Sequence, residues 1–301
     1  MGDHLRNETA SGHLRNATAS GHLMNDYTAG GDGYLFYGLV GGVASQSTDQ
    51  YDATGDAWTN LLNAPAPTRS GLASFVIGTK GYAVGDTAGF DVSTEEFDPT
   101  GPSWTSKTDI SAFALTYNPG SDVGSTGHVF GDIFAATNYE YVVDSWTTKT
   151  VCPMMGNLAT ACSISGVAYV LWAAVAGTFH SYVIDTWTAL TNFPATGRSY
   201  AAMVTVGTKA YLMGGYGAAL AKDCYEYDPT GNSWTAKTSA PNPTRRGHLG
   251  LSLNSKAYFF GGDDAAGTYY ADVDYYDPVG DSWTSATDMA ATRTQMGGVV
   301  L

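Results

Sequence analysis

The chain has 301 residues, of which 44% are apolar and 14% charged, and its formal net charge is -14. This length allows one large domain or two ordinary ones. Gly, Thr, Ser and Tyr are abundant and Glu is scarce, which favours an all-β class of short strands and tight turns. The negative charge argues against a nucleic-acid partner, because phosphate binding needs clustered Lys and Arg. The sequence contains no run of 18 apolar residues, so no insertion into a membrane is expected.

Residues 1–32 are predicted to form an extended arm outside the folded domain. Their sequence repeats nearly every nine residues as HLRNETASG, HLRNATASG and HLMNDYTAGG. With a period of nine, the three repeats do not fall on one face of a helix or of a strand. The arm also has too little apolar surface to fold alone. The arm is either flexible or a strap that docks the protein into a larger assembly. The candidate anchoring residues are His4, Leu5, His13, Leu14, His22 and Leu23.

Residues 33–301 carry a second, longer repeat that is marked by tryptophans at intervals of 46, 42, 41, 47 and 49 residues. These intervals are typical of four-stranded propeller blades. An aromatic residue and a turn precede each tryptophan, as in YDPTGNSW, which predicts a hairpin. The six tryptophans are Trp58, Trp104, Trp146, Trp187, Trp234 and Trp283.

A short apolar strand that ends in small residues follows most of these tryptophans, as in AYLMGG and AYFFGG. In three repeats an arginine stands thirteen residues before the tyrosine of that strand, at Arg69, Arg198 and Arg245. The combined pattern of Arg, diglycine, Tyr and Trp resembles the kelch repeat over residues 33–301. The resemblance implies a six-bladed kelch-type β-propeller. The third and fourth repeats lack the Arg, and Trp172-Ala173 replaces the diglycine in the fourth.

The two chain ends are predicted to complete one shared blade. The final segment TRTQMGGVVL matches the innermost strand of the other repeats, and GYLFYGLVGG matches the second strand. Joining Leu301 directly to Gly33 places Gly38 24 residues after Trp283, the spacing of the second-strand tyrosine elsewhere. A ring closed in this way leaves no exposed sheet edge.

Residues suited to catalysis are sparse, and we expect no enzyme activity and no cofactor. Some kelch-like propellers are copper oxidases or sugar mutarotases, but His128, His180 and His248 stand at three different repeat positions, so no metal site is expected. Glu95 and Glu140 flank strand aromatics and are expected to face solvent. The three cysteines have no zinc-site spacing and are expected to be packed thiols; they are Cys152, Cys162 and Cys224.

The loops that follow the diglycine positions are predicted to form a recognition face together with the loops that enter the innermost strands. They carry carboxylates and aromatic rings, which suit a glycan or a protein, because a ring stacks on an apolar sugar face while carboxylates accept hydroxyl hydrogen bonds. The candidate ligand-binding residues are Asp86, Asp132, Asp263, Asp264, Trp172, Tyr216, Tyr269 and Tyr270. Trp172 stands where the repeat prefers Gly, although its ring could instead be tucked between loops.

The opposite face is expected to be more basic, because Lys80, Lys209 and Lys256 occupy matching turns there, and the arm should leave from it. These features favour a non-enzymatic binding and assembly module on the surface of a virion appendage or a cell-surface assembly. The arm would bind protein partners in that assembly, and the propeller would recognise a protein or glycan receptor. An extracellular or virion-surface location is expected, and a virion appendage would fit the polar N-terminus, which does not resemble a secretory signal. The alternatives are a cytoplasmic kelch adaptor and a sugar-active propeller enzyme.

Overall fold

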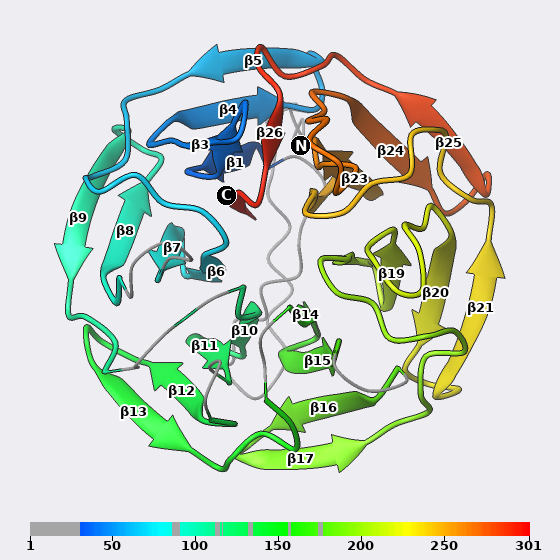
Figure 1. The fold of residues 1–301 in the computed structure, drawn as a ribbon. Coiled ribbons are helices and arrows are strands. Elements are labelled where there is room, and N and C mark those ends of the chain that lie inside the picture. Colours follow the sequence, from blue (N-terminus) through cyan, green and yellow to red (C-terminus); the bar gives the residue numbers. More distant parts are fainter. Residues whose placement is uncertain are drawn as a thin grey trace, which may run out of the picture.

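The computed structural model describes residues 31–85, 91–111, 115, 117–131, 135–155, 158–173 and 177–301. These residues contain no helix, and most of their strands form six four-stranded antiparallel sheets arranged around a central axis (Figure 1). The predicted all-β, six-bladed fold is therefore confirmed. The predicted arm, apart from Gly31 and Asp32, and all six candidate anchoring residues lie outside the described residues.

The blades are numbered in chain order, and each is given from its innermost strand outward. Blade 1 contains β27 (Gly297–Val300), β1 (Gly33–Phe36), β4 (Thr48–Asp52) and β5 (Ala57–Asn60). Blade 2 contains β6 (Ala73–Ile77), β7 (Lys80–Val84), β8 (Thr94–Asp98) and β9 (Ser103–Lys107). Blade 3 contains β10 (Gly120–Val123), β11 (Thr126–Phe130), β12 (Asn138–Tyr141) and β13 (Trp146–Lys149).

The second half of the ring repeats this arrangement. Blade 4 contains β14 (Thr160–Ile164), β15 (Val167–Leu171), β16 (Phe179–Val183) and β17 (Thr186–Ala189). Blade 5 contains β18 (Ala202–Val206), β19 (Lys209–Met213), β20 (Cys224–Asp228) and β21 (Ser233–Lys237). Blade 6 contains β22 (Leu249–Leu253), β23 (Lys256–Phe260), β24 (Val273–Asp277) and β25 (Ser282–Ser285).

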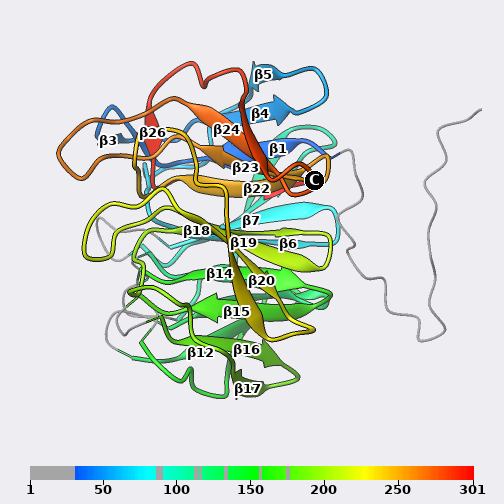
Figure 2. The ribbon, with the colours of Figure 1, turned by 90° about the vertical axis from the view of Figure 1, so that its right-hand side faces the viewer.

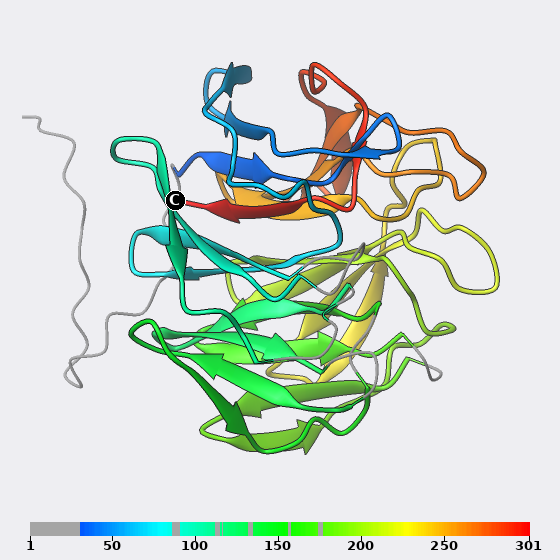
Figure 3. The same ribbon diagram turned by 60° about the vertical axis from the view of Figure 1, so that its left-hand side comes forward.

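A small sheet of β26 (Arg293–Thr294), β2 (Leu39–Val40) and β3 (Val43–Ala44) stands on one face of the ring. We call this face of the ring the loop face, because it carries the connections that enter the innermost strands. The C-terminus lies at the opposite face, as the side views show (Figures 2 and 3). The propeller therefore has two chemically distinct faces joined by a central channel.

The two chain ends close the ring as predicted. β27 pairs antiparallel with β1, and Asp32 and Leu301 exchange two backbone hydrogen bonds of 3.1 Å. The predicted register was wrong, because Tyr34 and not Gly38 takes the second-strand tyrosine position, opposite Val299. Joining Leu301 directly to Gly33 had left out the turn that links the first two strands of a continuous blade. Gly38 follows the strand and has a positive φ of 93°.

A circle of six backbone hydrogen bonds ties the innermost strands together at the loop face. Each blade contributes one residue with positive φ just before its innermost strand, and its N–H donates to the carbonyl of the corresponding residue in the preceding blade. The N···O distances run from 2.7 to 3.3 Å. The six residues are Gly71, Tyr117, Leu158, Tyr200, Gly247 and Gln295. This axial ring shows directly that the propeller is closed.

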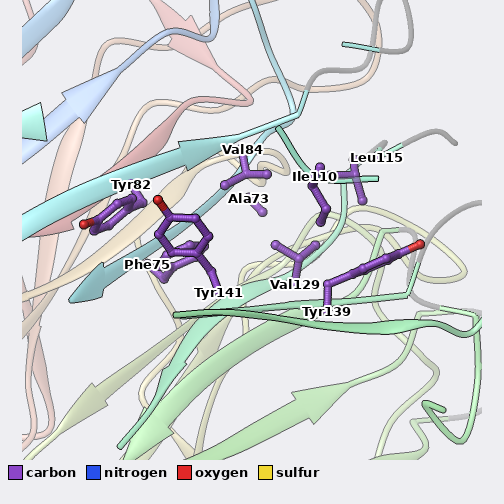
Figure 4. Packing of buried hydrophobic residues seen from close by; sticks show 9 residues of the cluster. All are labelled: Ala73, Phe75, Tyr82, Val84, Ile110, Leu115, Val129, Tyr139 and Tyr141. Carbon is purple, nitrogen blue, oxygen red and sulfur yellow. The ribbon is translucent and has the colours of Figure 1, made fainter. Parts of the chain in front are cut away.

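Aromatic side chains fill the wedges between neighbouring blades. Between blades 2 and 3, Phe75 stacks on Tyr82 with ring centroids 5.3 Å apart, and Tyr141 lies 5.3 Å from Tyr82 (Figure 4). Each of the six repeat tryptophans is partly buried on an outermost strand. They cover the wedges from outside, where their ring faces pack on the tyrosines.

The tryptophans also belong to a hydrogen-bonded latch between blades. At the interface of blades 3 and 4, Asp185 accepts hydrogen bonds from the Tyr182 hydroxyl at 3.0 Å and from the Thr150 N–H at 2.7 Å. The Nε1–H of Trp187 donates to the Thr150 carbonyl at 3.2 Å. One blade thus clamps both backbone groups of a threonine in the preceding blade.

The same latch joins four other pairs of blades. In the same order of Tyr, acceptor, Thr and Trp, its members are Tyr51, Asp56, Thr287 and Trp58; Tyr141, Asp144, Thr108 and Trp146; Tyr227, Asn232, Thr191 and Trp234; and Tyr276, Asp281, Thr238 and Trp283. The interface between blades 1 and 2 differs, because Phe97, Pro102 and Leu62 take the first three places. There the Nε1–H of Trp104 is buried and has no acceptor among the described residues. We call this interface the blade 1–2 seam.

The kelch arginines are buried and paired with carboxylates. Arg69 contacts Glu95 at 3.2 Å, so the expectation that Glu95 faces solvent was wrong. Arg198 pairs with Asp223 at 2.6 Å, and Arg245 pairs with Asp274. The remaining arginine of this kind was missed in the sequence because the closing blade is split between the two chain ends. It is Arg293, which pairs with Asp49 at 2.8 Å.

Candidate functional site

The axial ring surrounds a hollow of about 120 Å³ that opens on the loop face. We call this hollow the axial mouth. Its lining consists of the six ring residues and the residue that follows each of them. Because each ring residue uses both its backbone N–H and its carbonyl in the closed circle, the backbone of the mouth is rigid, and recognition depends on the side chains. Three of these side chains are large and polar.

Tyr117, Tyr200 and Gln295 meet across the axial mouth. The rings of Tyr117 and Tyr200 contact edge to face with centroids 4.8 Å apart. The Tyr117 hydroxyl donates to Gln295 Oε1 at 2.6 Å. Burial raises the pKa of Tyr200, so its hydroxyl keeps its proton and can donate a hydrogen bond at neutral pH. These side chains offer aromatic surface together with hydrogen-bond donors and acceptors.

Arg246 extends the axial mouth outward over blade 6. Its guanidinium lies 4.8 Å from the centroid of the Tyr200 ring, and its Nε–H donates to Asp263 at 3.0 Å. Asp263 is only 4% exposed, and its second oxygen accepts a hydrogen bond from Thr294 at 2.9 Å. Both carboxylate oxygens of Asp263, a predicted ligand-binding residue, thus already accept hydrogen bonds from within the protein. Asp263 holds Arg246 and the rim in place and does not present a free carboxylate.

Two predicted residues lie in the loops next to this rim. Tyr216 is 42% exposed, and its backbone forms a β-bridge with Ser199, the neighbour of Tyr200 in sequence. Tyr269 forms a β-bridge with Asp263 and is partly buried. The loop face over blades 5 and 6 therefore carries three tyrosines, Tyr200, Tyr216 and Tyr269.

Two further predicted residues lie in the same loop of blade 6. Asp264 is partly exposed, and its carboxylate accepts hydrogen bonds from the N–H groups of Ala266 and Thr268, which lower its pKa. Tyr270 is partly buried. Asp86 and Asp132 lie outside the described residues.

The prediction that Trp172 presents its ring to a ligand was wrong. The side chain is completely buried, with 0% exposure. Its Nε1–H donates to His180 Nδ1 at 3.2 Å, and its ring lies 5.7 Å from that of Trp187. Burial lowers the pKa of His180, which keeps the imidazole neutral and able to accept this bond. An indole in place of Gly fills the core of blade 4, which is the alternative that the sequence had left open.

The opposite face lacks the free lysines that the sequence suggested. Lys80 pairs with Asp98, Lys256 pairs with Asp277 at 3.2 Å, and Lys209 pairs with Glu226 at 2.5 Å. Each pairing joins the first turn of a blade to its third strand. The expected surplus of positive charge was therefore wrong, because each lysine has a carboxylate partner.

The histidines and cysteines have separate surroundings. His128 lies 3.1 Å from the Asn138 side chain, and His248 Nε2 lies 3.1 Å from the Met213 carbonyl. In the part of the chain that the structure describes, no three His, Cys, Asp or Glu side chains gather where one metal ion could contact them all. The three cysteines are buried and are not joined in disulfides, as expected for packed thiols.

The described residues contain no helix that is long and apolar enough to cross a membrane. Comparison with curated proteins gave no match. The kelch-motif family model matches residues 197–241 and 244–290, which correspond to blades 5 and 6 with the loops that enter them. These are the repeats that keep both the Arg and the diglycine.

Among solved structures, one titled "Structure of YjhT" resembles this chain with a TM-score of 0.66 at 16% sequence identity. The match covers 77% of this chain and 87% of YjhT. Likeness at this level of identity shows the architecture alone, and one architecture supports many functions. Together with the axial ring, the two matched motifs show that the chain folds as a closed six-bladed β-propeller whose blades 5 and 6 carry kelch motifs.

Proposed function

We propose that this protein is a non-enzymatic recognition module that binds a protein or a glycan at the axial mouth. We also propose that residues 1–32 anchor it in a larger particle, either a virion appendage or a cell-surface assembly. The observation that carries the recognition proposal is the meeting of Tyr117, Tyr200 and Gln295 inside a closed backbone ring.

The chemistry of the axial mouth supports a polar, ring-shaped or extended ligand. Tyrosine rings give a large contact area at a small cost in conformational entropy, and their hydroxyls add directional hydrogen bonds. Tyr200 is further held by Arg246, so less side-chain freedom is lost when a ligand binds. A sugar ring or a protein loop meets both requirements, since each offers an apolar face and several hydrogen-bonding groups.

The recognition proposal is tested by Tyr200→Ala, with Val279→Ser as the matched control. Val279 is 97% exposed in the turn between β24 and β25, on the face opposite the mouth. Wild type and both variants are applied to a glycan array and to purified candidate partners, and melting temperatures verify folding. Loss of the Tyr200 ring should weaken ligand binding by about 10-fold to 30-fold, while the Val279 variant binds normally. Equal affinities for the wild type and the Tyr200 variant would place recognition elsewhere, and chemical conversion of a bound glycan would contradict the non-enzymatic proposal.

The anchoring proposal is tested by deleting residues 1–32. The deletion removes the Asp32–Leu301 hydrogen bonds but keeps the four residue pairs between β27 and β1, so the shortened chain should still fold and close. Limited proteolysis of the full chain should remove the arm first. The shortened protein should keep its affinity for the ligand but fail to enter the assembly. Unfolding of the ring on deletion, or normal incorporation without the arm, would refute anchoring and leave the recognition proposal intact.

A further inference from the structure

The channel below the axial ring holds a buried carboxylate. The channel has a volume of about 250 Å³ and is lined by residues of all six innermost strands. Each innermost strand is the last strand of its sheet, so one of its edges has no neighbour within the blade. In Figure 1 these edges surround the axis. The channel is therefore bordered by strand edges that carry backbone carbonyl oxygens and N–H groups.

One layer of the channel is polar over four consecutive blades. In blades 3 to 6, this layer consists of the innermost-strand residue that pairs with the second residue of the neighbouring strand, which is a Gly or an Ala. In blades 3 to 6 its members are Asp122, Ser163, Thr205 and Ser252. Val76 and Val300 take the equivalent positions in blades 2 and 1. The oxygen-bearing side chains thus form one continuous arc and do not alternate with apolar ones.

Asp122 carries the only carboxyl group of this arc. It is 9% exposed, the Ser163 side chain hydrogen-bonds to it, and no Lys, Arg or His among the described residues forms an ion pair with it. The other buried carboxylates of the blades each face a cationic side chain: Glu95 and Asp274 pair with arginines, and Glu226 pairs with two lysines. A buried carboxylate without such a partner is costly unless a cation or a proton neutralises it.

We propose that the axial channel binds a hard cation, with the Asp122 carboxylate as its charged ligand and hydroxyl, backbone carbonyl and water oxygens as the others. Calcium fits best, because it accepts six to eight oxygen ligands in flexible geometry, whereas magnesium demands a near-ideal octahedron. The channel has room for about eight water molecules at roughly 30 Å³ each, so the ion can keep part of its hydration shell. A single carboxylate predicts weak binding, with a Kd on the order of 10⁻⁴ to 10⁻³ M.

The test compares metal-stripped wild type with Asp122→Asn, which keeps the shape of the side chain and removes its charge. Asp264→Asn, in the exposed loop of blade 6, is the control for binding at the protein surface. Addition of 10 mM CaCl₂ at pH 7 and constant ionic strength should raise the Tm of the wild type and of the control by about 2 to 5 °C, as expected for a shift of the unfolding equilibrium by roughly tenfold to hundredfold. The Asp122 variant should show no shift.

Equilibrium dialysis with radioactive calcium gives a second measurement that does not depend on stability. It should find about one calcium ion bound per chain in the wild type and no bound calcium in Asp122→Asn. Should that variant fail to fold, Ser163→Ala and Ser252→Ala should each weaken calcium binding several-fold. The proposal is overturned if the wild type binds no calcium, if the Asp122 variant binds it equally, or if only a lower pH and no cation raises the Tm, which would mean that a proton neutralises Asp122.

Discussion

Five of the six interfaces between blades share one polar latch, and the blade 1–2 seam has lost it. In a latched interface such as that of blades 3 and 4, Asp185 has a positive φ of 55°, which aims its carboxylate at the neighbouring blade. At the seam Pro102 takes this position, and the proline ring fixes φ near about -65°, so the same turn cannot form. The fixed φ of Pro102 therefore removes the side-chain acceptor of the latch. Without that acceptor, a tyrosine hydroxyl and a threonine N–H would have no partner at the seam.

On its outer side, where the latch would lie, the seam is held by apolar and aromatic contacts, while nearer the axis Ser74 and Gly298 share hydrogen bonds across it. The Trp104 ring lies 5.1 Å from Phe97 and 5.3 Å from Phe36, and Leu61 packs on the same cluster. Its indole N–H stays buried without an acceptor among the described residues, which costs about 1 to 3 kcal/mol. Leu62, in place of the latch threonine, is 44% exposed. The comparison shows that the tryptophan alone does not define an equivalent interface.

The largest expected effect is the loss of a latch tryptophan. Trp234→Ala removes both the ring packed on Tyr227 and the hydrogen bond to Thr191, and should lower the free energy of unfolding by about 3 kcal/mol. Denaturant titration measures this. Trp234→Phe should cost about 1 kcal/mol, while Trp104→Phe should cost less, since it removes an N–H that has no partner. Equal costs for the two Phe variants would contradict the distinction between latch and seam.

A smaller effect is expected from the acceptor of the latch. Asp185→Ala leaves the Tyr182 hydroxyl and the Thr150 N–H without their partner and should cost about 2 kcal/mol. Asp185→Asn is the matched control, because blade 5 uses Asn232 for the same two bonds. Thermal unfolding should show near-normal stability for the Asn variant. If Ala and Asn behave alike, the side-chain oxygen does not hold the blades together.

The latches also predict a pH dependence. Hydrogen bonds from threonine N–H and tyrosine O–H groups lower the pKa of Asp56, Asp144, Asp185 and Asp281 below the ordinary value of 3.8. A lowered folded-state pKa stabilises the protein above the unfolded pKa, and this stabilisation is lost as the pH falls from about 4 through the folded pKa. Between pH 5 and 2.5, a variant with Asn at all four positions should lose less stability than the wild type. Parallel pH profiles would mean that these carboxylates play no part in acid unfolding.

The smallest expected effect is a gain from repairing the seam. The triple variant Leu62→Thr, Phe97→Tyr and Pro102→Asp recreates the latch sequence next to Trp104. It should stabilise the protein by about 1 kcal/mol, because new hydrogen bonds are partly offset by the greater freedom of the unfolded chain without proline. Pro102→Asp alone is the control and should not stabilise. A triple variant no more stable than this control would show that the seam cannot adopt the latch geometry.

The fold could be predicted well from the sequence because each blade is determined by short local sequence patterns. Turn residues, strand alternation and the spacing of Trp58 to Trp283 recur in each repeat, and local chemistry determines them. The site was predicted less well, because exposure depends on neighbouring blades that no local pattern reveals. Trp172 departs from the repeat and is buried, whereas Tyr200 was not among the predicted site residues. Tyr117, Tyr200 and Gln295 meet only through the closed ring, and their shared offset before the innermost strands was the one pattern that could have identified them.

Native-state hydrogen exchange, followed by mass spectrometry, tests most directly whether the interfaces differ. Peptides that cover β5 with Leu62, and β8 with the turn through Trp104, report on the seam, and the corresponding peptides of the other blades report on the latches. Partial opening should occur first where the polar latch between blades is missing. We predict that the seam peptides exchange faster than their counterparts at all five latched interfaces. Equal protection around the ring, or earlier opening at a latched interface, would contradict the conclusion that the latch holds the blades together.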